Sequence, residues 1–363
     1  TSLSDTQVAA LQSRDLGAIL KTVIGAMTTS QIASLSGNQV VGFTSAQIKA
    51  LTDQQIAALG TQALASFTTD QIPVLSSVQL NALSAESFSA LTTSQIAVLP
   101  ASVVKVIATA TLSGLTTDQA QSLTTEQVRS LAVNQLAILT TDQLVALETA
   151  DAASLTTAQA SAFSTDQLSH LSTGQIEVLT TALMSALSST QIRALTTAQI
   201  AAMTTSQVAG LTTAQVAALK TVQIPAFETQ DVLSFTTSQI KSLTTAQANA
   251  LTTAQANVLT TSQFVAVTSE NFASISTASI QALRTDQIAA MTTQQAAAMT
   301  TAQLRALGTD QVQALNTRDL NALNATQIRA LSTAQVVALT TQQVATLGTG
   351  LLSNLTTSQL AAI

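Results

Sequence analysis

The side chains that could perform chemistry are few and stand apart in this sequence. The 363 residues include one histidine, His170, and no cysteine. One histidine cannot build a histidine-based metal site, and a chain without cysteine has no thiol nucleophile, disulfide or cysteine zinc site. The 18 acidic residues are spread along the chain, so a carboxylate pair for hydrolysis or a calcium site would need chance convergence. We therefore expect no catalytic, cofactor-binding or metal-ligating residues, no cofactor and no enzymatic activity.

The remaining candidate sites have simpler interpretations. His170 could form a pH-sensitive contact, but we interpret it as a tolerated substitution at a position that is usually Ala. The triplets that begin at Asn324 and Asn354 match the glycosylation acceptor Asn-x-Thr. In a chain so rich in threonine such triplets arise by chance.

The charge balance bears on the partners. The net charge is −6, and 12 Lys and Arg over the whole length offer no phosphate-binding surface, so we expect no nucleic-acid partner. No run of 18 apolar residues occurs, which predicts no membrane span. Charged residues are 8 %, against about 25 % in typical globular domains, whereas apolar residues are 46 % and supply ample material for a core.

An eight-residue repeat organises the whole chain. From Leu3, every eighth residue to Ile363 is Leu, Ile, Met, Phe or Val. Residues 1–363 therefore form one continuous array of 45 octads after a three-residue start. With the octad numbered 1 to 8 and ending on the Leu, the consensus is Thr-Thr-x-Gln-Ile/Val-x-Ala-Leu, and position 4 is Gln in 32 of the 45 octads.

The octad predicts a series of very short helices. Thr-x-x-Gln is a capping box, in which Thr at the N-cap and Gln at N3 satisfy each other's backbone N–H groups. The Leu of the preceding octad and the Ile or Val at position 5 then form a hydrophobic staple. A single long helix is excluded because its Leu stripe would rotate by about 80° in every octad. A β-solenoid is the alternative, although positions 5 and 8 would point to opposite faces of a strand.

The placement of charge supports separate short helices. Of the 18 acids, 17 occupy positions 1 to 4, and seven of the 12 bases occupy position 6. Acids stabilise a helix N-terminus and bases a C-terminus, so this sorting indicates a new helix in every octad. Pro73 and Pro225 lie at position 6, which indicates that the helix is one turn long there or ends as a 3₁₀ helix.

One octad cannot fold alone, because helices this short are below the nucleation length. We therefore predict an all-α solenoid of very short capped helices, one per octad, with positions 5 and 8 lining the core. Thr, Ser and Gln are expected on the outside. The sequence does not determine the number of octads per coil. Residues 12–27, 100–115 and 268–283 lose the Thr-Thr-x-Gln signature, which indicates drift in a tolerant repeat, with distortions or contact sites as the other interpretation.

The pattern Leu-Thr-Thr-x-Gln-Ile/Val-x-Ala-Leu, as in residues 195–219 and 331–347, resembles the octad arrays of very large secreted or surface proteins of Gram-negative bacteria. The resemblance covers essentially the whole chain. It implies an extracellular, cell-surface-associated location and a structural or adhesive role.

These observations lead to three hypotheses about function. The first is a non-enzymatic secreted structural protein that assembles with other copies of itself into an extracellular filament, tube or surface sheath. Its basis is the near-consensus last octad, which leaves that end of the array open to further copies or further chain. The second is a stalk or binding module of a giant bacterial adhesin. The third is an ice-binding or glycan-binding array of threonine hydroxyls.

Overall fold

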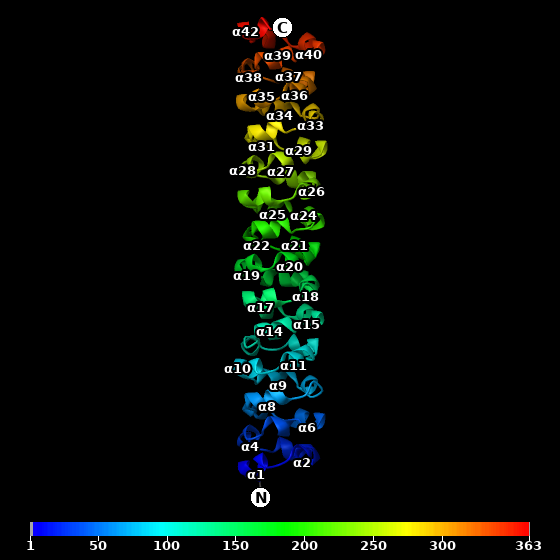
Figure 1. Cartoon of the computed structure of the whole chain (residues 1–363), viewed down its shortest axis with the longest axis vertical. Helices are drawn as coiled ribbons and strands as arrows, with labels where there is room; N and C mark the ends of the chain where they lie inside the picture. Colours follow the sequence, from blue (N-terminus) through cyan, green and yellow to red (C-terminus); the bar gives the residue numbers. More distant parts are fainter. Residues whose placement is uncertain (1–2, 363) are drawn as a thin grey trace. The chain divides into compact units, whose positions relative to one another are not determined.

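The computed structural model describes residues 3–362, and the fold within that range is entirely helical, without a strand. The prediction of one very short helix per octad is confirmed, and the β-solenoid alternative is not supported. The chain divides into two compact units, Thr1–Ala186 and Leu187–Ile363. Figure 1 shows that the helices of each unit follow one another in sequence order.

The helices of the first unit are α1 (Asp5–Ala9), α2 (Ser13–Ala18), α3 (Lys21–Gly25), α4 (Thr29–Ala33), α5 (Gly37–Val40), α6 (Ser45–Ala50), α7 (Asp53–Ala58), α8 (Thr61–Ser66), η1 (Ile72–Val74), α9 (Ser77–Asn81), α10 (Ala85–Ser89), α11 (Thr93–Ala97), α12 (Ala101–Val104), α13 (Thr109–Leu112), α14 (Thr117–Gln121), α15 (Thr125–Ser130), α16 (Val133–Ala137), α17 (Thr141–Ala146), α18 (Thr149–Ser154), η2 (Thr157–Ala162), α19 (Thr165–His170), α20 (Thr173–Val178) and α21 (Thr181–Ala186).

The helices of the second unit are α22 (Ser189–Ala194), α23 (Thr197–Ala201), α24 (Thr205–Gly210), α25 (Thr213–Ala218), η3 (Thr221–Ala226), α26 (Thr229–Ser234), α27 (Thr237–Ser242), α28 (Thr245–Asn249), α29 (Thr253–Val258), α30 (Thr261–Ala266), α31 (Ser269–Ser274), α32 (Thr277–Gln281), α33 (Thr285–Ala289), α34 (Thr293–Ala298), α35 (Thr301–Ala306), α36 (Thr309–Ala314), α37 (Thr317–Asn321), α38 (Ala325–Ala330), α39 (Thr333–Val337), α40 (Thr341–Thr346), α41 (Thr349–Leu352) and α42 (Thr357–Leu360).

The chain changes direction where one octad meets the next. In the octad of α24, Thr204 at position 1 has an extended backbone (φ −76°, ψ 154°), and its hydroxyl accepts a hydrogen bond from the N–H of Gln207. After six helical residues the backbone becomes extended again at Leu211 (φ −62°, ψ 140°). The N-cap threonine and the leucine before it thus form the corner between helices, as the capping box predicts.

Successive octads wind into a superhelix within each unit. Within each unit most helices pack against the helix three octads further along, as α14 does on α17 and α28 on α31. The same octad reaches back to the fourth octad before it through hydrogen bonds that span 28 and 31 residues, such as those of Gln239. Since 28 residues are three and a half octads, one coil takes between three and four octads. The coil size is a property of the structure that the octad period does not reveal.

Positions 5 and 8 line the core, as predicted. Ile240 and Leu243 are 2 % and 8 % exposed, and most of the equivalent residues are buried, with exceptions such as Leu3 and Leu360 near the ends of the described range. The prediction that glutamine lies on the outside is wrong at position 4. Gln239 is 2 % exposed, because its polar amide finds all its partners inside the stack.

Three octads form 3₁₀ helices instead of α-helices. Pro73 lies in η1 and Pro225 lies in η3, which confirms the expectation that proline at position 6 gives a single tight turn or a 3₁₀ helix. The third, η2, contains no proline, and nothing in its sequence explains its geometry. The divergent octads of residues 100–115 still pack in the stack. Their helices are α12, which packs on α15, and α13, which packs on α10.

Candidate functional site

The repeated feature that joins the coils is a ladder of buried glutamine amides. The Oε1 atom of Gln295 accepts the backbone N–H of Thr292 at 2.9 Å. Its Nε2 atom donates to the carbonyl oxygens of Val267 and Phe264, both at 2.9 Å. A primary amide has one acceptor oxygen and two donor hydrogens, so this single side chain caps its own helix and binds the preceding coil.

We call one such position-4 side chain, with the hydrogen bonds that it makes to its own N-cap and to the preceding coil, a rung of the ladder. The same rung recurs throughout each unit. In the first unit, the glutamines that donate to the position-8 carbonyl 28 residues earlier are Gln31, Gln39, Gln47, Gln55, Gln71, Gln79, Gln95, Gln119, Gln127, Gln135, Gln143, Gln159, Gln167 and Gln175. In the second unit they include Gln215, Gln223, Gln239, Gln247, Gln255, Gln263, Gln287, Gln295, Gln303, Gln311, Gln327, Gln335, Gln343 and Gln359. The corner carbonyls that these glutamines reach are thereby satisfied although they are buried.

Shorter side chains preserve the donor where glutamine is absent. Thr111 donates its hydroxyl to the Leu83 carbonyl at 3.1 Å, and Asn271 donates its amide to the Leu243 carbonyl at 2.6 Å. Ser279 does the same to Leu251 at 3.0 Å. The bond between coils is therefore retained in these three octads although they lack the position-4 glutamine.

Two asparagines at position 6 supply a cap to a different coil. The Oδ1 atom of Asn81 accepts the N–H of Ala108, and the Oδ1 atom of Asn321 accepts the N–H of Gly348, at 2.6 and 3.1 Å. Each asparagine also donates from Nδ2 to a carbonyl 25 residues ahead. Sequence reasoning missed these residues. The available signal is an Asn placed 27 residues before the first residue of an octad that lacks the position-4 glutamine.

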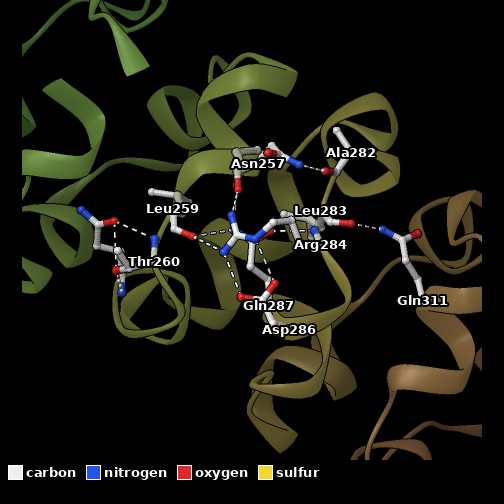
Figure 2. A network of polar contacts seen from close by, with 11 residues as sticks. Asn257, Leu259, Thr260, Ala282, Leu283, Arg284, Asp286, Gln287 and Gln311 are labelled. Carbon is white, nitrogen blue, oxygen red and sulfur yellow. Dashed lines mark hydrogen bonds and ion pairs between the residues drawn. The ribbon is translucent and has the colours of Figure 1, made fainter. Parts of the chain in front are cut away.

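Arg284 replaces the usual N-cap threonine and connects neighbouring coils (Figure 2). Its guanidinium donates to the carbonyls of Asn257 and Leu259 and to both carboxylate oxygens of Asp286, the latter at 2.9 and 3.0 Å. This hydrogen-bonded guanidinium holds the pKa of Asp286 below its ordinary value. Both side chains are partly exposed, so the arrangement is an ion pair on the surface of the stack.

A buried carboxylate occupies a rung position in the octad of α37. Asp319 is 0 % exposed, and its Oδ1 atom accepts the hydroxyl of Thr293 at 3.1 Å. Its Oδ2 atom has no hydrogen-bond partner. The Met291 carbonyl, 28 residues earlier, receives no hydrogen bond from the residues that the structure describes, because a carboxylate cannot donate. Part of the missing connection is supplied by Asn316, whose Nδ2 atom donates to the Ala289 carbonyl at 2.5 Å.

The residues considered for chemistry lie on the outer surface and are not brought together. His170 is half-exposed, and its Nδ1 atom lies 2.8 Å from the Asp166 carbonyl and 3.5 Å from the Asp166 carboxylate, one turn earlier in α19. Asn324 caps α38, whereas the side-chain oxygen of Asn354 accepts from Arg329. Over residues 3–362, no cluster of three or more His, Asp or Glu side chains could hold a metal ion.

The surface carries shallow hollows, of which one has several threonine and serine residues in its lining. That hollow, of about 520 Å³, is bordered by Glu126, Arg129 and a group of small polar residues that includes Thr156, Thr157 and Thr180. None of the helices in the described part of the chain is long and apolar enough to cross a membrane.

The comparisons with known proteins agree with this repeat architecture. A family model described as the ALTTAQ repeat matches residues 24–53, 144–181, 184–221, 224–261, 264–301, 297–318 and 312–349. These segments cover more than half of the chain. Among curated proteins no significant match was found.

Proposed function

The chain belongs to the ALTTAQ repeat family, and we propose that it is a non-enzymatic secreted structural protein that assembles into an extracellular filament, tube or surface sheath. Its partners in that assembly are other copies of itself. The observation that carries the proposal is the direction of the glutamine ladder within each unit.

The ladder gives every coil two different faces. Gln263 donates to the Phe235 carbonyl of the preceding coil, while the carbonyl of Phe264 accepts from Gln295 of the following coil. A surface of donors thus meets a surface of carbonyl acceptors at every step. A contact between two unlike faces is heterologous, and where it does not close into a ring it generates a filament. Copies of this chain can use the same pairing that joins coils inside it.

The resemblance to octad arrays of large secreted and surface proteins of Gram-negative bacteria supports the extracellular location. The low content of charge and the absence of cysteine are compatible with that setting. A solenoid stabilised by neighbouring repeats gains length without any change in its local contacts, which suits a structural role.

Negative-stain electron microscopy of the purified chain over a series of concentrations tests the proposal. We expect filaments of constant width whose length increases with concentration, and a sedimentation coefficient that rises in parallel. Monodisperse particles at every concentration would overturn self-assembly.

A stalk within a giant adhesin is the second candidate, and the outer surface favours it. Exposed large apolar residues are scattered along the array, as Val41, Val145 and Val265 are, and threonine is frequent among the exposed residues between them. A stalk requires such a surface because it must not adhere to neighbours. Monodisperse rods, together with a folded non-repeat domain encoded next to this array, would favour the stalk over the filament.

A further inference from the structure

Besides Asp319, two further buried aspartates occupy rung positions of the ladder, and these two share the same surroundings along the chain. Asp151 in α18 and Asp231 in α26 replace the position-4 glutamine, and each is 4 % exposed. The octads that contain them also share an unusual first residue, since Glu148 and Glu228 replace the N-cap threonine. The substitution therefore places an acid where a consensus octad has an amide.

The aspartates retain the accepting half of the rung. The Oδ2 atom of Asp151 accepts the backbone N–H of Glu148 at 3.3 Å, and the Oδ2 atom of Asp231 accepts that of Glu228 at 3.1 Å. The same bond occurs in consensus octads, where the Oε1 atom of the position-4 glutamine accepts the backbone N–H of the N-cap residue. Gln239 accepts that of Thr236 in this way at 2.7 Å. The side chains thus lie in the place of the glutamine and point the same way.

The donating half is missing when the carboxyl is ionised. In consensus octads the position-4 side chain donates to the position-8 carbonyl 28 residues earlier, which here belongs to Leu123 and to Met203. Neither carbonyl receives a hydrogen bond from any residue within 3–362. A carboxylate has no hydrogen to offer, whereas a neutral carboxyl has one O–H.

The surroundings disfavour a negative charge at both sites. No ion pair joins either aspartate to a cation in the part of the chain that is described. The helices packed on α18 are α15, which carries Glu126 and Arg129, and α20, which carries Glu177. The helices packed on α26 are α24 and α29, which carry no titratable residue.

Burial raises the pKa of Asp151 and of Asp231 above the ordinary value of an aspartate, since desolvation penalises the charged form. The nearby carboxylates of Glu148 and Glu228 raise the pKa further. The N–H bonds from the same two residues lower the pKa without reversing its direction, and for Asp151 a hydrogen bond from the Thr125 hydroxyl adds to that opposing effect.

We propose that Asp151 and Asp231 are proton-dependent rungs: the protonated carboxyl donates its O–H to the carbonyl of Leu123 or Met203 and closes the ladder, and ionisation opens it. The proton comes from solvent and returns to it. Each unit thereby tightens in mild acid and loosens at one defined coil as the pH rises.

The sign of the effect follows from linkage. A group whose pKa is higher in the folded state than in the unfolded chain stabilises the fold fully below the unfolded pKa and loses that contribution as the pH rises through the folded pKa. The stabilising effect of these two rungs is therefore greatest in acid and declines above the ordinary aspartate range.

Thermal unfolding of the full chain from mild acid to neutral pH tests the proposal. The variant Asp151→Asn/Asp231→Asn carries amides that donate at every pH, and Asp118→Asn/Asp310→Asn removes two exposed carboxylates at position 3, one in each unit. We expect the unfolding midpoint of the wild type and of the exposed-site control to fall as the pH rises through the folded pKa values. The buried-site variant should lose that part of the slope and have the higher midpoint at neutral pH.

Infrared difference spectroscopy supplies a readout that a purely structural effect would not move. We expect a protonated-carboxyl C=O band in the folded wild type in mild acid, at a pH where exposed aspartates are ionised. The band should be absent from Asp151→Asn/Asp231→Asn and present in the exposed-site control. An unchanged pH slope in the buried-site variant, or no such band in the wild type, would overturn the proposal.

Discussion

The backbone N–H of Ala108 donates to the side-chain oxygen of Asn81, 27 residues earlier, at a distance of 2.6 Å. In a consensus octad that N–H is satisfied by the glutamine three residues later, as in the bond from Thr116 to Gln119. The octad that starts at Ala108 has Thr111 at that position, which is too short to reach back. Asn81 of the preceding coil therefore caps this helix. The hydrogen bond that lies within one octad in the consensus here joins two coils.

Replacement of Asn81 by alanine should lower the free energy of unfolding by about 1–2 kcal/mol, because the Ala108 N–H loses its acceptor. In a Thr111→Gln background the local acceptor for the Ala108 N–H is restored. Asn81→Ala should therefore lower the free energy of unfolding markedly less in that background. Urea unfolding of the two single variants and the double variant measures the difference. Equal costs in both backgrounds would show that Asn81 does not act as the cap.

The glutamine ladder predicts that replacement by alanine destabilises the fold far more at one of two adjacent glutamines than at the other. Gln295 is 2 % exposed and makes the rung bonds, whereas Gln294 is exposed at position 3. Gln295→Ala should destabilise the fold by about 2–4 kcal/mol, since it leaves a buried carbonyl and an N-cap N–H without partners. Gln294→Ala should change the stability by less than about 0.5 kcal/mol. Similar losses in the two variants would contradict the role of the rung.

The helix starts and their corners could be predicted from sequence, because capping is local. Thr204 and Gln207 lie three residues apart, and their mutual hydrogen bonds depend only on that spacing. The 3₁₀ geometry at Pro225 was predictable for the same reason.

The coil size and the burial of position 4 could not be predicted in this way. Both depend on the angle between successive helices. That angle is set by packing between residues about 28 positions apart, and the residue pattern within one octad does not specify it. Glutamine was expected on the surface because a polar residue is usually exposed. Its fit to a corner carbonyl of another coil, as between Gln239 and Leu211, is visible only once the coils are stacked.

Asp319 offers a route to a more stable protein. Its Oδ2 atom is buried without a partner, so Asp319→Gln restores the donor for the Met291 carbonyl and the acceptor for the Asn316 N–H. We expect the free energy of unfolding to increase by about 1–3 kcal/mol. Asp310→Gln, at an exposed position of the neighbouring octad, is the control and should have little effect. A loss of stability in Asp319→Gln would show that this rung does not accept the consensus residue.

Gly114 marks a point where two coils approach closely. A Cβ atom there would overlap the backbone carbonyl of Ala85, whereas a Cβ atom at Gly60 would meet nothing within 4 Å. Gly114→Ala should therefore destabilise the fold by about 1–3 kcal/mol, because backbone has to shift to make room. Gly60→Ala should be close to neutral. Calorimetric unfolding of both variants checks the contrast, and a harmless Gly114→Ala would argue against this spacing of the coils.

The distance between labelled residues 28 positions apart tests the superhelix most directly. The chain has no cysteine, so Ser206→Cys can be paired with Ser234→Cys or with Ala218→Cys, two partners that both occupy position 7. Electron paramagnetic resonance of nitroxide pairs should give a shorter distance for residues 206 and 234, which lie on adjacent coils, than for residues 206 and 218, which lie on different sides of one coil. A distance that instead increases with separation along the chain would contradict the coil of three and a half octads and the ladder that holds it.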